Sequence, residues 1–80
     1  MARQVPNLNA AFGKVLNRYR TEKGISQEKL AHECDLHRTY ISMLERGLKS
    51  PSLNTIAALA RALKTPAHEL VRATEHLTSS

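Results

Sequence analysis

The sequence contains a single cysteine, no tryptophan, one phenylalanine and two tyrosines. One cysteine cannot close a disulfide within the chain, so nothing requires an oxidising compartment. No apolar run approaches the roughly 20 residues that a membrane helix needs. The first residues also lack the apolar stretch of a signal peptide. We therefore expect a soluble, cytoplasmic protein that does not contact a membrane.

The chain is also short, and its 80 residues leave room for one small domain without a large enclosed substrate cleft. Hydrophobic residues make up 41% and charged residues 24%, which is typical of a folded domain. Because aromatic residues are scarce, aliphatic residues and alanines must fill the interior. Twelve Lys and Arg residues against seven Asp and Glu residues give a net charge of +5, which favours a polyanionic partner.

Motifs of catalysis and cofactor binding are missing as well. The sequence has no P-loop, no glycine-rich dinucleotide turn and no nucleophile elbow. His32, Cys34 and His37 suggest a metal site, but positions 32 and 34 point about 200° apart on a helix. A structural zinc site needs four suitably placed ligands. We predict no enzyme activity, no metal and no cofactor, and we interpret Cys34 as a small core residue whose redox role stays open.

Apolar residues near the start of the chain recur at i, i+3, i+4 and i+7, as in an amphipathic helix: Phe12, Val15, Leu16 and Tyr19. Either Asn7 or Asn9 can cap the start of this helix, and Gly24 can supply the left-handed residue at its end. Gly13 inside the helix costs about 1 kcal/mol relative to alanine. The pattern leaves two explanations open, a loose first turn or a close contact at this position.

Four further helices are predicted from caps and apolar spacing. The second follows Ser26, the third runs from Arg38 to Gly47, the fourth follows Ser52, and the fifth covers about residues 66–76. The fourth should pack through Leu53, Ile56, Ala57, Leu59, Ala60 and Leu63. Residues 1–8 are expected to form a flexible arm, 9–76 the domain and 77–80 a frayed tail. No alternating pattern supports a strand, so we predict an all-α, compact five-helix bundle.

The second and third helices, separated by a turn of about three residues, have the form of a helix-turn-helix at about residues 26–46. Ala31 is expected where the second and third helices cross. Ile41 should pack onto this crossing, and Leu36 in the turn should close the space between the two helices. One face of the third helix carries polar and mixed residues and no acid: Arg38, Thr39, Ser42, Met43 and Arg46. Such a face suits the major groove of DNA, where base edges offer hydrogen-bond acceptors to arginine and thymine methyl groups to apolar atoms.

Three blocks of the sequence carry a resemblance to a known family: ISQEKLA at 25–31, RTYISMLERG at 38–47 and PSL at 51–53. They resemble the Cro/CI-type (XRE-like) helix-turn-helix regulators over about residues 10–72. Among these, the chain looks most like small stand-alone members such as restriction–modification controller proteins. The resemblance implies a lambda-repressor-like DNA-binding fold, and it implies a transcriptional regulator that binds double-stranded DNA as a homodimer on a palindromic operator.

The resemblance also implies roles for matching positions. The candidates for base contacts are His37, Arg38, Thr39, Ser42 and Met43. Gln27 matches a phosphate-binding position, and the other candidates for phosphate contacts are Tyr40, Arg46, Lys49, Ser52 and Asn54. Arg20 and Glu45 match a structural ion pair, and the fifth helix is expected to form the dimer interface through Leu70, Val71 and Leu77.

Two positions depart from the family pattern. Asp35 stands where glycine is usual, and we expect it to tolerate the left-handed conformation at modest cost. His37 stands where serine is frequent, so a weaker cap is expected for the third helix. An alternative function is a protein-interaction module, such as an antitoxin of a toxin–antitoxin pair or a transcriptional adapter. RNA binding is less favoured, because the major groove of A-form RNA is too narrow for a helix.

Overall fold

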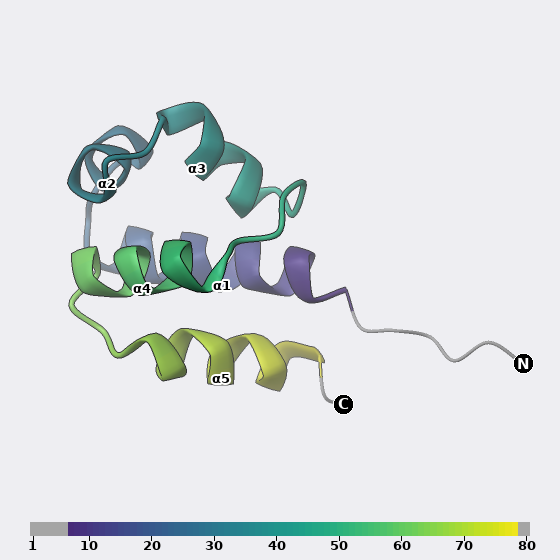
Figure 1. The fold of residues 1–80 in the computed structure, drawn as a ribbon. Helices are drawn as coiled ribbons and strands as arrows, with labels where there is room; N and C mark the ends of the chain where they lie inside the picture. Colours follow the sequence, from purple (N-terminus) through teal and green to yellow (C-terminus); the bar gives the residue numbers. More distant parts are fainter. Residues whose placement is uncertain (1–6, 79–80) are drawn as a thin grey trace, which may run out of the picture.

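The computed structural model describes residues 7–78, and within this range it contains five helices and no strand (Figure 1). The helices are α1 (Leu8–Glu22), α2 (Gln27–Cys34), α3 (Arg38–Glu45), α4 (Leu53–Ala62) and α5 (Ala67–Thr78). The all-α, five-helix prediction is confirmed. Residues 1–6 of the expected arm and 79–80 of the expected tail lie outside the described residues. No described helix combines the length and apolarity that crossing a bilayer requires.

Two helix boundaries differ from the prediction. Leu8, which was expected in the arm, is the first residue of α1, because the cap is Asn7: its Oδ1 accepts a hydrogen bond from the backbone N–H of Ala10 at 3.1 Å. At the other end, α5 continues to Thr78 instead of ending near residue 76. The Thr78 hydroxyl donates to the Glu75 carbonyl at 2.9 Å in this last turn.

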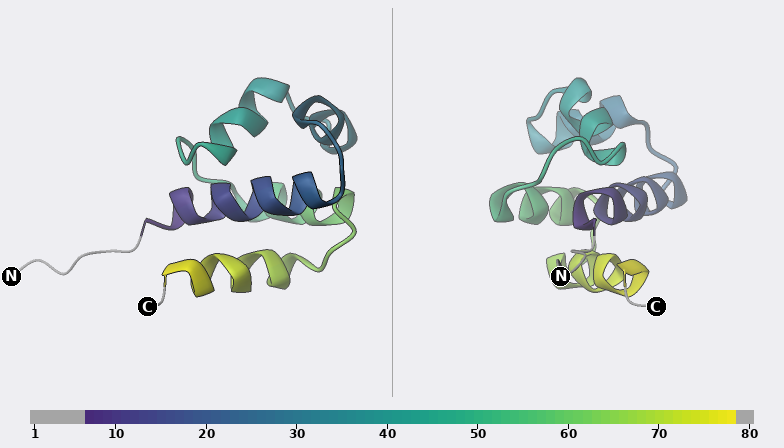
Figure 2. Two further views of the ribbon diagram at one scale, coloured as in Figure 1. Left: turned by 180° about the vertical axis from the view of Figure 1, so that it is seen from behind. Right: turned by 90° about the vertical axis from the view of Figure 1, so that its right-hand side faces the viewer.

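The helices form three layers (Figures 1 and 2). The middle layer contains α1 and α4, with α2 and α3 on one side and α5 on the other. The buried core draws on every helix: Phe12, Val15, Leu16, Leu30, Ala31, Ile41, Leu44, Leu59, Ala60, Leu63 and Leu70. Each fully buried leucine contributes about 1.5–3 kcal/mol. The mainly aliphatic core follows from the shortage of aromatic residues.

The inward face of α4 is narrower than its sequence suggested. Ile56, Leu59 and Leu63 pack against or within the core, but the Leu53 side chain is 83% exposed and Ala57 is exposed too. Leu53 opens the helix, and its side chain points back toward the N-terminal end, beyond the core. Ala57 lies about 200° around the helix from Leu59 and therefore faces solvent. Both were wrongly predicted to pack.

Local signals in the sequence account for most helix ends. The Ser26 hydroxyl accepts from the Lys29 N–H, and the Ser52 hydroxyl accepts from the Thr55 N–H, each at 3.0 Å. Asp35 ends α2 with a φ of 58°, as expected for the residue that replaces glycine there. Lys64 adopts a similar left-handed conformation (φ 55°) after α4, which its residue type did not indicate.

Gly13 marks a close contact between α1 and α3. A Cβ atom built on Gly13 would lie 2.5 Å from the carbonyl oxygens of both Leu44 and Glu45. Of the two explanations left open, close packing therefore holds, and the first turn is not loose. Gly47 makes a similar approach just after α3, since its Cβ would lie 2.8 Å from the Cα of Ala10, and its φ is +75°. The C-terminal end of α3 thus rests directly on the backbone of α1.

We expect Gly13→Ala to lower the free energy of unfolding by about 2 kcal/mol, because overpacking at this contact outweighs the ~1 kcal/mol that alanine contributes to helix propensity. Urea unfolding would measure the change. The exposed neighbour Lys14 offers a matched control, and Lys14→Ala should stay within about 0.5 kcal/mol of the parent. A Gly13→Ala variant more stable than the parent would contradict the close contact.

Candidate nucleic-acid interface

The α2–α3 pair has the geometry of a helix-turn-helix. Leu30 and Ala31 of α2 and Ile41 of α3 are buried at the crossing, and Leu36 in the turn packs against the same core. The Leu36 N–H donates to the Ala31 carbonyl at 2.8 Å, which closes the turn. Figures 1 and 2 show α3 at an outer edge of the molecule, with α5 beyond the α1–α4 layer. No part of α5 covers α3.

The residues expected to contact bases share this outer face. His37, Arg38 and Thr39 are exposed, whereas Ser42 and Met43 are half-buried along the same helix. Within residues 7–78, no hydrogen bond or ion pair engages the Arg38 side chain. His37 makes no side-chain cap hydrogen bond to α3, in line with the weak cap expected there. This leaves polar groups at the start of α3 accessible to a ligand.

The candidates for phosphate contacts fall into three groups. Arg46, Lys49 and Asn54 are exposed around the C-terminal end of α3 and the start of α4, while the half-buried Tyr40 packs against the core. The Ser52 hydroxyl is occupied by its cap and by a 3.0 Å hydrogen bond to the Thr55 hydroxyl. Gln27 is also engaged within the chain, because its amide nitrogen donates to Glu45 Oε1 at 2.9 Å.

The expected ion pair between Arg20 and Glu45 is present and lies at the centre of a larger cluster. Arg20 Nε donates to Glu45 Oε2 at 2.6 Å and Arg20 Nη2 to Oε1 at 3.1 Å. Asn17 Nδ2 donates to the same Oε1 at 3.0 Å. The side chains of Arg20 and Glu45 are only 12% and 5% exposed. Asn17 was missed, although its position three residues before Arg20 places both on one face of α1.

The ionisation of Glu45 depends on these neighbours. Burial raises the pKa of the Glu45 carboxyl, but hydrogen bonds from Arg20, Asn17 and Gln27 lower it more, so its pKa lies below the ordinary value of 4.5. The hydrogen bond to Glu45 likewise raises the pKa of Arg20. The pair is therefore charged at neutral pH and holds α1 against α3.

Cys34 has the character of a structural residue. Burial raises the pKa of its thiol, and its Sγ donates to the Ala58 carbonyl at 3.5 Å. A raised pKa leaves little reactive thiolate at neutral pH. Among residues 7–78, His, Cys, Asp and Glu side chains form no group of three that could hold a metal ion.

The residues expected at a dimer interface do not behave alike. Leu70 is 0% exposed within the single chain, so it belongs to the core and cannot lie on an interface. Val71 and Leu77 are 39% and 47% exposed. The reason is helical phase: Leu70 and the buried Thr74 form the inward face of α5, which leaves Val71 about 100° around the helix.

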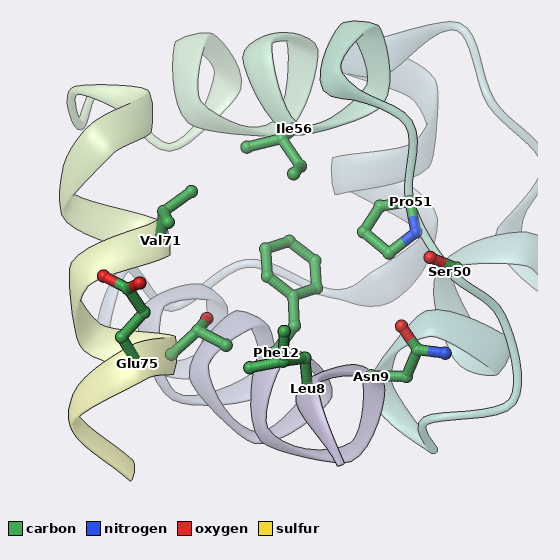
Figure 3. A pocket seen from close by; sticks show the side chains of 9 residues that line it. Leu8, Asn9, Phe12, Ser50, Pro51, Ile56, Val71 and Glu75 are labelled. Carbon is green, nitrogen blue, oxygen red and sulfur yellow. The ribbon is translucent and has the colours of Figure 1, made fainter. Parts of the chain in front are cut away.

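Val71 lines an open apolar pocket of about 230 Å³ (Figure 3). Leu8 and Phe12 reach it from α1, Ile56 from α4, and Pro51 from the segment before α4. Glu75 of α5 is the one ionisable residue in its described lining. A half-exposed leucine and valine at its rim make this a surface that another apolar group can cover.

The helices and the exposed α3 define a helix-turn-helix protein, and comparison with known proteins gives the same class. The helix-turn-helix family model HTH_3 matches residues 16–70. The chain therefore belongs to the XRE-type helix-turn-helix family of DNA-binding transcription regulators.

The similar proteins include restriction-modification controller proteins and other transcription regulators. The control protein C.BamHI of Bacillus amyloliquefaciens is 46% identical over 66 residues, which cover 81% of this chain and 82% of that protein. The crystal structure of the restriction-modification controller protein C.AhdI of Aeromonas hydrophila is 44% identical, with a TM-score of 0.75 over 76% of this chain and 92% of that one. The regulator SinR in complex with DNA is 31% identical, with a TM-score of 0.72 over 75% of this chain and 97% of that one.

We expect the free energy of unfolding to fall in acid because of Glu45 and the residues that hydrogen-bond to it. Because its pKa is lowered on folding, Glu45 stabilises the fold fully above pH 4.5, and this contribution disappears as the pH falls through the lower folded-state pKa. Glu45→Gln should cost about 2 kcal/mol at pH 7. Urea unfolding from pH 7 to pH 3 should show the two proteins converging as the pH falls below 4.5. A stability difference that stays constant across this range would contradict the assignment.

Proposed function

We propose that this protein is a sequence-specific transcriptional regulator that binds a palindromic double-stranded DNA operator as a homodimer. The observation that carries this proposal is the outer face of α3, where Arg38 is exposed and unpaired on a helix held rigidly by buried contacts. An arginine presented in this way can donate two hydrogen bonds to guanine O6 and N7. The net charge of +5 favours association with the phosphate backbone.

Rigidity of α3 supports base recognition. The helix is buried through Ile41 and Leu44, rests on Gly13 at its C-terminal end and is tied to α1 through Glu45. The helix backbone is therefore held in one orientation, so little ordering of the backbone is needed on binding. The exposed Arg46, Lys49 and Asn54 lie near its end and are suited to phosphates on either side of the groove.

The apolar pocket supports a homodimer. A protein with a small core gains stability when the exposed Val71 and Leu8 are covered. A two-fold axis would place the pocket rim of one copy against the same pocket rim of a second copy. Two recognition helices would then enter successive major grooves about 34–36 Å apart on one side of the duplex. Such a dimer reads two half-sites and therefore discriminates better than a single short helix.

Selection of binding sites from random duplexes at physiological salt tests the DNA-binding proposal, and Arg38→Ala then tests base readout. This variant should relax the preference at one base pair per half-site, at a cost of about 1–3 kcal/mol in discrimination. Lys49→Ala is the control, because loss of a phosphate contact weakens binding to all sequences and lowers the salt dependence. An equal loss on all sequences for Arg38→Ala would indicate a phosphate contact instead.

For the dimer, the informative variant is Val71→Glu, because Leu70→Glu would place a charge in the monomer core and unfold the chain. Val71→Glu adds a carboxylate at the half-exposed rim and should shift sedimentation toward the monomer. Operator affinity should fall by about tenfold or more, which corresponds to at least 1.4 kcal/mol. His68→Glu adds the same charge at an exposed position of α5 outside the pocket and should leave the dimer intact. An unchanged sedimentation profile for Val71→Glu would reject this interface.

A further inference from the structure

The Glu45 carboxylate joins α3 to the start of α2 as well as to α1. Glu45 is the last residue of α3, and Gln27 is the first residue of α2. The 2.9 Å hydrogen bond from Gln27 Nε2 to Glu45 Oε1 crosses between them. Neither residue type requires this contact, because glutamine at the start of a helix ordinarily extends into solvent. The contact therefore needs an explanation beyond the ion pair with Arg20.

The chemistry of the two groups fixes the orientation of the Gln27 amide. An ionised carboxylate accepts hydrogen bonds but cannot donate them, so the NH2 end of the amide must face Glu45. A flipped amide would place its carbonyl oxygen against the carboxylate oxygen, which is repulsive. Only one of the two amide hydrogens is needed for Glu45. Within residues 7–78 no other hydrogen bond engages this amide, which lies on a half-buried side chain beside the exposed Ser26 and Glu28.

The carboxylate is itself firmly held, so it can act as an anchor. Arg20 bonds both of its oxygens, and Arg20 Nη1 also donates to the Ile25 carbonyl at 2.8 Å, just before α2 begins. With the Glu45 side chain only 5% exposed and paired with a guanidinium, its negative charge is shielded from an approaching phosphate. Removing the carboxylate would free the Gln27 amide to rotate and to present its carbonyl outward.

We propose that Glu45 is a positioning residue for DNA binding: its carboxylate orients the Gln27 amide so that the second N–H donates to a DNA phosphate. This inference rests on the proposed function. It assigns Glu45 a role beyond its structural ion pair, since it links the end of the recognition helix to a phosphate contact at the start of α2. The positions of α2 and α3 on the duplex are thereby set together.

A double-mutant cycle on DNA affinity tests this role, with a mixed-sequence duplex as the probe. Gln27→Ala should weaken binding about tenfold, as expected for a lost hydrogen bond to a charged group. Because the amide is neutral and releases no counterion, the salt dependence should stay unchanged. Glu45→Ala should weaken binding by a similar factor in the parent, and it should add less than a further twofold in the Gln27→Ala background. Thermal unfolding of each variant fixes a temperature at which all are folded.

The opposite result of the cycle is also defined. If Glu45→Ala weakens binding equally in both backgrounds, Glu45 acts only through the fold, and the positioning role is overturned. Failure of the parent protein to bind any duplex would overturn the proposed function itself, and this inference with it. The two failures are therefore distinguishable in one set of titrations.

A second measurement uses the unmodified protein and does not depend on a variant that folds. In ¹⁵N-labelled protein, the Gln27 side-chain NH2 signals should shift as Glu45 is protonated in acid without DNA. At pH 7 the same signals should shift when the mixed-sequence duplex is added. Gln27 side-chain signals that stay unchanged while the backbone amides of α3 shift would overturn the inference and leave the proposed function standing.

Discussion

The contact between α1 and the C-terminal end of α3 is the constraint on which the rest of the structure depends. The Leu44 and Glu45 carbonyls lie so close to Gly13 that no side chain fits between the two helices. Further along α1, Arg20 Nε donates a hydrogen bond to Glu45 Oε2 at 2.6 Å. One contact excludes volume and the other supplies attraction, and together they fix the distance and rotation of α3. The exposed Arg38 is therefore carried on a helix whose position is set by the rest of the fold.

A chain of 80 residues has few ways to achieve such rigidity. Its core is aliphatic and thin, with each helix contributing only a few buried side chains. The helix caps and the left-handed residues Asp35 and Gly47 end helices within one or two residues. The connections between helices can therefore be short. Apolar surface that the core cannot cover remains at Leu8, Val71 and Leu77. In the proposed homodimer, a second subunit would cover some of that surface.

Much of the fold could be predicted from the sequence because its signals are local. Helix caps at Ser26 and Ser52 and the turn at Asp35 depend on residues only a few positions apart. The exposed face of α3 follows from spacing alone. Several features could not be found this way. Leu70 and Val71 are adjacent apolar residues, and only the packing of α5 decides that the first is buried and the second lines the pocket.

The sequence by itself determined the number and type of helices, the helix-turn-helix and the residues that α3 presents, because helical periodicity and capping act within short segments. It left open why Gly13 is glycine, it wrongly predicted that Leu53 packs, and it did not indicate that Gln27 contacts Glu45. Those answers depend on groups brought together from distant positions: Gly13 with Glu45, and Gln27 with the same glutamate. Tertiary structure decided them because steric exclusion and hydrogen bonding between separate helices exist only after the helices have packed.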